Sequence, residues 1–174
     1  MSKITVRMTK ETLYDFLLYH AYSKFSGFLI NILGFAIIFM GVFSYVSGRT
    51  GAIGVVLYLI AAAAFIGYTP LQLNLRAKKQ VQVNPEYKGP VEYTFSDEDG
   101  ITAQWEDGNR HVEWADVQRA VVAPKTIGVY YGKDQAFILP KKDFGDEFLP
   151  IYQMIVRHLA ENSNTGEKNN KSAK

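Results

Sequence analysis

The chain has 174 residues and a formal net charge of +2, from 19 Lys and Arg against 17 Asp and Glu. So small a charge gives no indication of nucleic-acid binding, and we expect no nucleic-acid partner. The absence of cysteine excludes disulfides, thiolate metal sites and cysteine nucleophiles. The mean hydropathy of −0.06 is typical of a soluble protein, but the excess of apolar residues lies between Gly27 and Tyr68.

Residues 1–26 are predicted to form a short strand followed by an amphipathic helix. Ile4, Val6 and Met8 alternate with polar residues, as in a half-buried strand. Thr9 is suited to cap a helix, because its hydroxyl can accept a hydrogen bond from a first-turn amide. Apolar residues then follow at helical spacing, at Leu13, Phe16, Leu17 and Ala21. This helix either packs on a folded domain or lies along a membrane surface.

Two uncharged apolar runs occupy residues 27–69. The first, 28–46, has 19 residues, and a helix of that length spans roughly 28 Å, close to the apolar thickness of a bilayer. The second, 51–68, has 18 residues, and Pro70 is expected to end it. A cleaved signal peptide fits poorly, because a polar segment precedes the first run and a second run follows it. We therefore predict a transmembrane helical hairpin.

Basic residues on either side of the hairpin predict its orientation. Those before the first run are Lys3, Arg7, Lys10 and Lys24, and those after the second are Arg76, Lys78 and Lys79. The connecting loop carries only Arg49. By the positive-inside rule, both termini of this multi-pass protein are expected to face the cytoplasm.

Small residues within the runs predict close helix packing. Gly34 and Gly41 belong to a series of glycines spaced every seven residues, which forms a slowly drifting stripe on a helix. Ala63 and Gly67 form a small-xxx-small pair in the second run. These faces would let the two helices, or a second copy of the chain, approach closely. A homo-oligomer is therefore one expected assembly.

Residues 70–160 are predicted to form a cytoplasmic domain of antiparallel strands. Residues 71–83 are expected to change from helix to strand, with Val81 and Val83 on one face. Alternating runs then surround turns at 97–100 and 107–108, and the second of these turns predicts a hairpin. One helical turn is expected at 114–117. Breaks at Pro124 and at 132–133 divide residues 118–140 into three more strands.

A last helix is expected to open at Asp146 and to cover the free face of the sheet. Its predicted apolar face consists of Phe148, Leu149, Tyr152, Ile155, Val156 and Leu159. Residues 161–174 have no apolar residue except one alanine, and they are predicted to form a disordered tail. The predicted fold class is an α+β membrane protein, with a transmembrane helical hairpin and an antiparallel domain closed by a C-terminal helix.

Three strings of this domain resemble the bacterial YcxB-like family: YTFSDEDGI (93–101), HVEWADVQRAVVAPKTIGVYY (111–131) and AFILPKKDF (136–144). The resemblance covers about residues 80–145 and depends on the order and spacing of the strings. It implies a pleckstrin-homology-like fold, a bent barrel of antiparallel strands with a C-terminal helix. It also implies a location in the inner membrane of a bacterial cell, and it implies no activity. We take Gly100, Trp114, Asp116 and Pro140 as fold-signature residues. Trp114 is expected to plug one end of the barrel, and Asp116 to cap backbone amides there.

No motif in the sequence predicts an enzyme, a metal site or a cofactor. The acidic run 97–99 ends at Gly100 and a strand, whereas an EF-hand calcium loop needs ligands over about twelve residues. The three histidines are far apart in sequence, without a spacing that favours zinc. Nucleotide-binding and nucleophile-elbow motifs are also absent from the sequence. We expect a non-enzymatic protein without a cofactor.

Two basic clusters are candidate contacts for lipid headgroups. Arg76, Lys78 and Lys79 directly follow the second run, where each charge near anionic lipid contributes about 1 kcal/mol. Lys141 and Lys142 would join them if the domain docks with that end toward the membrane. Otherwise these two lysines are a solvated strand end.

The expected function is that of a membrane-anchored interaction or regulatory module, which binds a protein, a peptide or a lipid headgroup. Its expected partners are membrane lipids and a protein that the sequence does not identify. The alternative is a small transport or channel-accessory subunit that acts through oligomerised hairpins. The stripe of glycines is the feature that supports the alternative.

Overall fold

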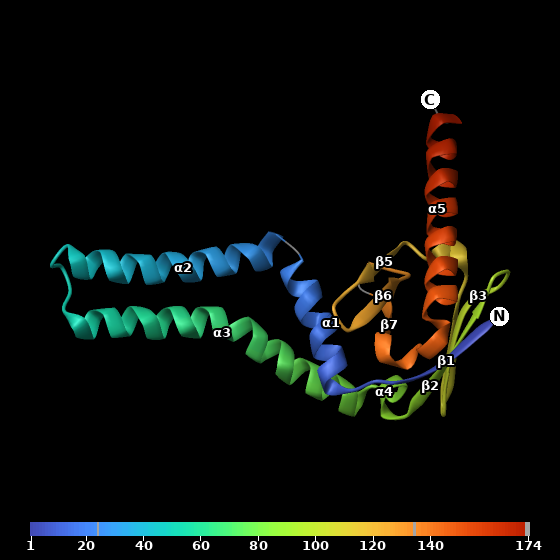
Figure 1. Ribbon diagram of the computed structural model, residues 1–174, viewed down its shortest axis with the longest axis horizontal. Coiled ribbons are helices and arrows are strands. Elements are labelled where there is room, and N and C mark those ends of the chain that lie inside the picture. The colour runs from blue at the N-terminus through green and yellow to red at the C-terminus, as the bar shows by residue number, and fades with distance from the viewer. Residues whose placement is uncertain (24, 134, 173–174) are drawn as a thin grey trace. The chain divides into compact units, whose positions relative to one another are not determined.

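The computed structural model describes residues 1–23, 25–133 and 135–172, and the side chains of 25–28 and 164–172 lie outside this description. The chain forms two compact units (Figure 1). The hairpin unit is Leu17–Lys78, and the folded unit joins Met1–Phe16 to Lys79–Lys174. The folded unit is thus made of two stretches of chain that the hairpin separates. The sequence predicted a strand and helix at 1–26, a hairpin at 27–69 and a domain at 70–160.

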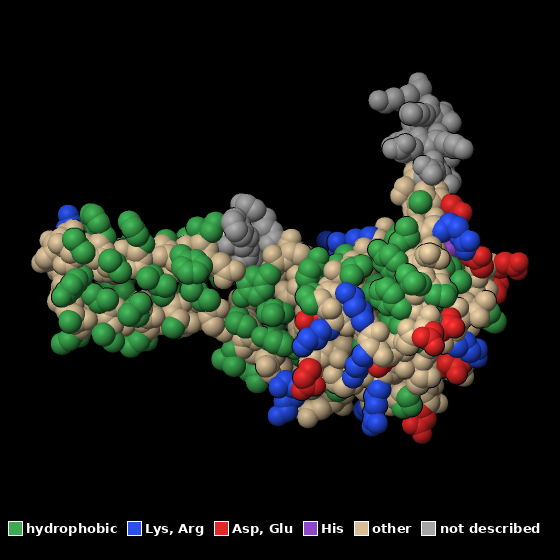
Figure 2. All heavy atoms as spheres, in the orientation of Figure 1, with side chains coloured by type: hydrophobic (Ala, Val, Ile, Leu, Met, Phe, Trp, Pro, Cys, Tyr) green, Lys and Arg blue, Asp and Glu red, His purple; other side chains and the backbone are tan. Residues whose placement is uncertain are grey.

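The hairpin unit contains α2 (Phe25–Val46) and most of α3 (Ala52–Val83). By length and composition, both helices could cross a membrane. Their large apolar side chains face outward: Phe39 is 73% exposed and Ile53 is 80% exposed. Figure 2 shows hydrophobic side chains along the visible face of both helices. The core helices of a soluble protein would instead bury such side chains.

Pro70 lies inside α3, so the predictions that it ends the helix and that residues 71–83 form a strand are wrong. A proline within a helix removes one hydrogen bond and bends the axis. The ribbon of α3 indeed bends partway along its length (Figure 1). The following residues include leucine, glutamine, alanine and lysine, which are good helix formers and continue the helix to Val83.

The first sheet of the folded unit has four antiparallel strands in the order β1-β2-β3-β4. Its strands are β1 (Ser2–Arg7), β2 (Pro90–Ser96), β3 (Gly100–Trp105) and β4 (Gly108–Val112). In the pairing of β1 with β2, Ile4 lies opposite Tyr93 and Val6 lies opposite Val91. The predicted N-terminal strand and the predicted β3–β4 hairpin are both confirmed. Completing this sheet requires residues from before and after the helical hairpin.

The second sheet has three antiparallel strands in the order β5-β6-β7. Its strands are β5 (Arg119–Val122), β6 (Thr126–Tyr130) and β7 (Ala136–Pro140). The 3₁₀ turn η1 (Trp114–Asp116) precedes it, and the 3₁₀ turns η2 (Lys141–Asp143) and η3 (Gly145–Glu147) follow it. The helical turn and the three strands that the sequence predicted in this part of the chain are confirmed. Pro140 closes β7 at the edge of the sheet, where a strand tolerates a missing amide.

One hydrophobic core contains side chains from both sheets and from α5 (Phe148–Ser172). Tyr93 and Phe137 are buried from the strands and meet edge to face, with ring centroids 5.5 Å apart. Ile151 and Ile155 of α5 are completely buried. The prediction that a C-terminal helix covers the sheet is therefore confirmed.

The buried face of α5 differs from the predicted one in the residues it lacks and in those it adds. Leu149 is 63% exposed and Val156 is 45% exposed, whereas Ile151, absent from the predicted face, is fully buried. The side chains that pack on the core are those of 148, 151, 152, 154, 155 and 159, and most of them follow one stripe of a helix. Leu149 and Val156 lie seven residues apart on the flank of that stripe. Hydrophobicity alone did not separate the stripe from its flank.

The helical backbone of α5 continues to Ser172, although composition predicted a disordered tail from residue 161. The side chains of 164–172 and all of residues 173–174 lie outside the described residues. The disordered tail stays a prediction.

The first half of α1 (Lys10–Tyr22) packs on the three-stranded sheet of the folded unit. Leu13 and Phe16 are buried, and the Phe16 ring lies 6.0 Å from the ring of Tyr130. Gly128 makes room for this ring, because a Cβ at that position would lie 3.0 Å from Phe16 Cζ. With core on one face and α1 on the other, all five residues of β6 are buried. The sequence left open whether this helix packs on the folded domain or lies along a membrane surface. Residues 10–16 pack on the folded unit.

Candidate functional site

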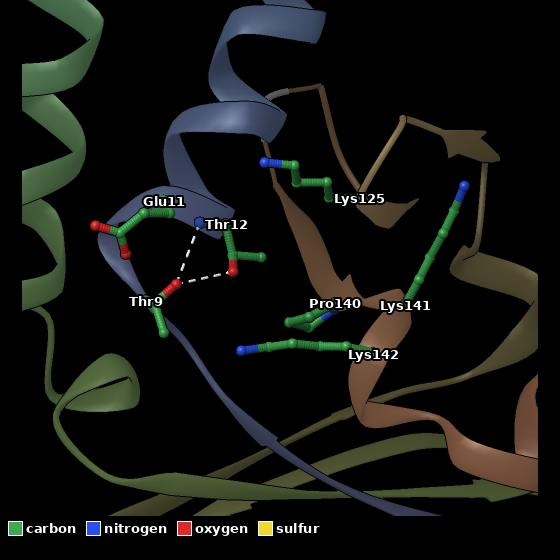
Figure 3. A pocket seen from close by; sticks show the side chains of 7 residues that line it. All are labelled: Thr9, Glu11, Thr12, Lys125, Pro140, Lys141 and Lys142. Atoms are coloured by element: carbon green, nitrogen blue, oxygen red, sulfur yellow. Dashed lines mark hydrogen bonds between the residues drawn. The ribbon is translucent and has the colours of Figure 1, made fainter.

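A cavity of about 540 Å³ lies in the folded unit, between the start of α1 and the ends of β6 and β7. It is lined by Thr9, Glu11, Thr12, Lys125, Pro140, Lys141 and Lys142 (Figure 3). We refer to it as the lysine cavity. It includes the Lys141–Lys142 pair that the sequence singled out.

Thr9 and Thr12 form the α1 wall of the lysine cavity. Thr9 caps the helix as predicted, since the Thr12 amide donates to Thr9 Oγ1 over 3.2 Å. The two hydroxyl oxygens lie 2.9 Å apart and share one hydrogen bond. One of the two hydroxyl protons therefore remains available for another acceptor.

Backbone hydrogen bonds fix the opposite wall. The Lys141 amide donates to the Lys125 carbonyl over 2.9 Å, which continues the β6–β7 pairing past Pro140. The Lys125 amide donates to Asp15 Oδ2 of α1 over 3.2 Å. The main chain of both lysines is thus held in place, and their side chains are free of this structural role.

The three lysines of the cavity have no ion pair within 4 Å among the described residues. In Figure 3 the side chains of Lys125 and Lys142 extend toward the Thr9–Thr12 turn, while Lys141 extends away from it. The carboxylate of Glu11 also points away from the lysines in this view. Three lysines and one glutamate leave the lining with two net positive charges. The cavity is therefore suited to an anion.

The basic residues of α3 lie elsewhere. Arg76, Lys78 and Lys79 are part of α3 and do not line the lysine cavity. Lys125, in contrast, was missed by the sequence reasoning. It stands alone after Pro124 in the β5–β6 turn, and only the pairing of β6 with β7 places it beside Lys141. A single lysine in a turn carries no signal that could have identified it.

Of the fold-signature residues, Gly100 and Trp114 have clear structural roles. Gly100 begins β3 with φ +110°, and a Cβ there would come within 2.9 Å of Glu113 Cα. The Trp114 indole is buried, donates to the Ser96 carbonyl over 2.8 Å and stacks on His158 at 4.4 Å. Asp116 does not cap the turn: no hydrogen bond of its carboxylate is found among the described residues. It sits at the end of η1, where its side chain is exposed.

A polar cluster that includes His158, the residue stacked on Trp114, ties α5 to the β2–β3 turn. Asp97 accepts hydrogen bonds from Arg157 and from His158, the latter over 2.8 Å. The hydrogen bond from His158, followed by that from Arg157, lowers the pKa of Asp97 below its ordinary value of 3.8. The acidic turn that could have suggested calcium thus holds helix α5. No group of three or more metal-ligating side chains is found in the part of the chain that the structure describes.

A second polar cluster anchors α4 (Pro85–Lys88), the short helix after α3. The buried carboxylate of Glu86 accepts from Arg110 over 3.1 Å, and Arg110 also donates to the Tyr131 hydroxyl over 3.0 Å. Burial, with the Glu86 charge nearby, raises the pKa of Tyr87 to about 12. Burial likewise raises the pKa of Tyr93 well above its ordinary value. The phenols of Tyr87 and Tyr93 therefore remain neutral at physiological pH. The hydrogen bonds of Arg110 hold α4 against the sheets.

The strands around the lysine cavity and the Trp114 turn carry the signature of a known family. Residues 97–150 match the family model described as YcxB-like protein. This match confirms the resemblance drawn from the sequence strings. The YcxB-like segment includes Trp114 and four of the cavity residues, Lys125, Pro140, Lys141 and Lys142, but not the α1 wall. No curated protein and no solved structure matches the chain.

Proposed function

We propose that the protein is a non-enzymatic, membrane-tethered module that binds an acidic ligand in the lysine cavity. The observation that carries this proposal is a cavity of about 540 Å³ lined by three lysines, none of which has an ion pair among the described residues. A cavity of roughly 300–1,000 Å³ is typical of sites for small ligands and headgroups. Lysine side chains that are not engaged in ion pairs favour the binding of an anion, because the anion offsets their mutual repulsion.

The tether is the pair α2 and α3. Outward-facing side chains such as Phe39 and Ile53 would lie in lipid and be stabilised there. The pairing of β1 with β2 supports two crossings, because a sheet that uses chain from before and after the helices needs both on one side of a membrane. The distribution of Lys and Arg supports the cytoplasmic side of a bacterial inner membrane.

We further propose that the two sheets are the halves of a pleckstrin-homology-like domain. Seven antiparallel strands, a common core and the C-terminal helix α5 support this assignment. The helical hairpin would then be an insertion between its first and second strands. The basic residues Arg76, Lys78 and Lys79 would lie where the second span leaves the bilayer and contact its headgroups.

The alternative, a channel or transport subunit built from oligomerised hairpins, gains no support from the glycine stripe. Gly34 and Gly41 face the partner helix within the same hairpin: a Cβ at Gly34 would lie 2.7 Å from Ile66 Cδ1, and one at Gly41 would lie 2.6 Å from Tyr58 Cβ. Gly67 has open space around it, and Ala62 rather than Ala63 is buried. The pair Ala63 and Gly67 therefore does not contribute to the α2–α3 contact.

Binding of acidic ligands tests the proposed function. The full chain, purified in neutral detergent, is passed over immobilised heparin, polyglutamate and vesicles of phosphatidylglycerol. We expect retention on at least one of these ligands, weaker at high salt and abolished by the double substitution Lys125→Gln, Lys142→Gln. The matched control is Lys88→Gln, Lys133→Gln, which removes exposed charges outside the cavity. Equal retention of the two variants would contradict binding in the cavity.

The tether has its own test, which the lack of cysteine makes simple. Single cysteines replace Ser47, an exposed residue of the α2–α3 turn, and Asp107, an exposed residue of the β3–β4 turn. In intact cells a membrane-impermeant maleimide should label the first and not the second, and both should react after lysis. Labelling of both in intact cells, or release of the protein by alkaline carbonate, would overturn the membrane assignment.

A further inference from the structure

The lysine cavity offers a specific set of donors, which restricts the kind of anion it can take. Lys125 and Lys142 approach the Thr9–Thr12 turn from the other wall (Figure 3). Each ammonium group provides three N–H donors, and the threonine pair provides one free O–H. Figure 3 shows the two ammonium groups on either side of the threonine pair, and the flexible stems of both lysines allow them to reach a ligand there. Such a set suits a compact anion with several acceptor oxygens better than a planar carboxylate with two.

Charge selects among the anions. The lining carries two net positive charges, from three lysines and one glutamate. A phosphate monoester carries about −1.5 to −2 at pH 7, because its second pKa is about 6. A phosphodiester or a carboxylate carries a single charge and would leave the cavity with an excess of positive charge. The phosphate monoester is the acidic group that matches the cavity both in charge and in number of acceptors.

We infer that the lysine cavity binds a phosphate monoester group, with Lys125 and Lys142 as its charged contacts and the Thr9–Thr12 pair as a hydroxyl donor. The group is carried either by a lipid headgroup or by a free phosphorylated compound. This inference rests on the proposed function, because it names the acidic ligand of the same cavity. Lys141 lies at the rim and contributes through its charge.

The side chains involved can be changed without disturbing the fold. Lys125 contributes to the fold through its main-chain amide and carbonyl, which bond Asp15 and Lys141. No hydrogen bond or ion pair of the Lys125 or Lys142 side chain is found among the described residues. Substitution by glutamine leaves a polar side chain, one atom shorter than lysine, and removes the positive charge. Substitution by arginine keeps the charge and serves as the conservative variant.

The test measures how fast each lysine of the full chain, in neutral detergent, is acetylated with and without inorganic phosphate. Phosphate should slow acetylation at Lys125 and Lys142 severalfold and leave Lys88, an exposed lysine outside the cavity, unchanged. Lys142→Gln should weaken the protection of Lys125 by about tenfold in phosphate concentration, as expected for one charge-assisted hydrogen bond. Lys142→Arg should retain it. Protection of all lysines alike, or protection that Lys142→Gln leaves unchanged, would overturn the inference.

A comparison with sulfate tests the requirement for two charges. For this test the probe is a phosphate monoester, glycerol phosphate. Between pH 5.5 and pH 7.5 its dianionic fraction rises from about a quarter to nearly all, because the second pKa of a phosphate monoester is about 6. Protection by glycerol phosphate, relative to Lys88, should rise accordingly. Sulfate is doubly charged at both pH values, and its effect should not change with pH. A glycerol phosphate effect that is also independent of pH would contradict selection of the dianion.

The source of the phosphate group is distinguished by lipid bilayers. The full chain is placed in nanodiscs of phosphatidylcholine with either phosphatidic acid, a monoester, or phosphatidylglycerol, a diester. Protection of Lys125 and Lys142 by phosphatidic acid alone identifies a lipid headgroup, and protection only by added inorganic phosphate identifies a free compound. If phosphatidylglycerol or polyglutamate protects the two lysines as well as phosphate does, the cavity binds acidic ligands without this selectivity. The proposed function would then stand while the phosphate inference fails.

Discussion

At the residue scale, Gly100 shows how a single position shapes the first sheet. It starts β3 with φ +110°, in a region that side-chain-bearing residues rarely adopt. Val112 and Glu113 of the neighbouring strand end lie where a Cβ would be. The close approach lets the chain leave β2 through the acidic turn and return to pair with it. This is the physical reason for the glycine that ends the string YTFSDEDG.

The substitution Gly100→Ala should lower the free energy of unfolding by at least about 2 kcal/mol, from backbone strain and steric overlap. The matched control is Gly89→Ala, at a glycine with φ −129° and nothing within 4 Å of the place of its Cβ. Unfolding of the full chain in detergent can be followed by tryptophan fluorescence, since both tryptophans belong to the folded unit. Equal stability of the two variants would contradict the described turn.

The cluster around Asp97 gives a prediction for pH. The pKa of Asp97 in the folded chain lies below its ordinary value of 3.8, because His158 and Arg157 donate hydrogen bonds to the carboxylate. The carboxylate therefore stabilises the fold above that value, and this contribution is lost as the pH falls through the folded pKa. Wild type should be more stable than Asp97→Asn at pH 5, and the difference should shrink below about pH 4.

Chemical denaturation at several pH values measures this difference. Asp107→Asn is the control, since Asp107 lies in the β3–β4 turn with no hydrogen bond or ion pair found among the described residues. Its stability relative to wild type should not follow the same curve. A difference for Asp97→Asn that grows on acidification would have the wrong sign and would reject the pKa assignment.

At the element scale, the hairpin depends on close approach of α2 and α3 at glycines. An ideal Cβ at Gly34 would lie 3.8 Å from Ile66 Cβ, within the range of about 3.5–4.5 Å that a disulfide requires. The double substitution Gly34→Cys, Ile66→Cys should therefore form an intramolecular disulfide on mild oxidation in membranes. The chain has no other cysteine to interfere.

Gly34→Cys, Gly67→Cys is the matched control, because Gly67 has no neighbouring atom within 4 Å of its Cβ position. Mass spectrometry of proteolysed protein separates disulfides within one chain from those between chains. A disulfide within the chain in the first variant and none in the control supports the described contact. Disulfides mainly between chains would show instead that the glycines pack against a second copy.

Elements were predictable from the sequence where the local pattern was strong. Strand alternation gave β1 and the β3–β4 hairpin, and length with apolar composition gave α2 and most of α3. The prediction that Pro70 ends the helix was wrong because the free-energy cost of a proline falls on one turn. The good helix formers after it favour helix over several turns. The contact of Phe16 with Gly128, and Lys125 beside Lys141, depend on pairing between distant segments. No local pattern encodes such pairing. The sequence therefore could not predict that Lys125 and the α1 residues Glu11 and Thr12 join Lys141 and Lys142 around one cavity.

At the scale of the whole molecule, the hairpin unit interrupts the folded unit in the sequence. β1 and the first half of α1 belong to the folded unit, yet the chain enters and leaves the hairpin before β2 begins. A ligand in the lysine cavity contacts α1 on one wall and the YcxB-like segment on the other. Binding would therefore link the segment that leads into α2 with the strands that follow α3. The site is complete only when both stretches of chain are present.

This discontinuity predicts that residues 79–174 do not fold by themselves. Ile4, Val6, Leu13 and Phe16 are buried in the folded unit, and burying four such side chains contributes about 6–12 kcal/mol. That is comparable with the whole stability of a domain, about 5–15 kcal/mol. Removing residues 1–16 also leaves β2 with an unpaired edge. A chain in which residues 1–16 are joined to 79–174 by a flexible Gly/Ser linker should unfold cooperatively on heating, whereas 79–174 alone should show no transition. If both chains unfold with the same midpoint, residues 1–16 are dispensable for folding. The domain would then lie wholly after the hairpin, as the predicted domain 70–160 had indicated.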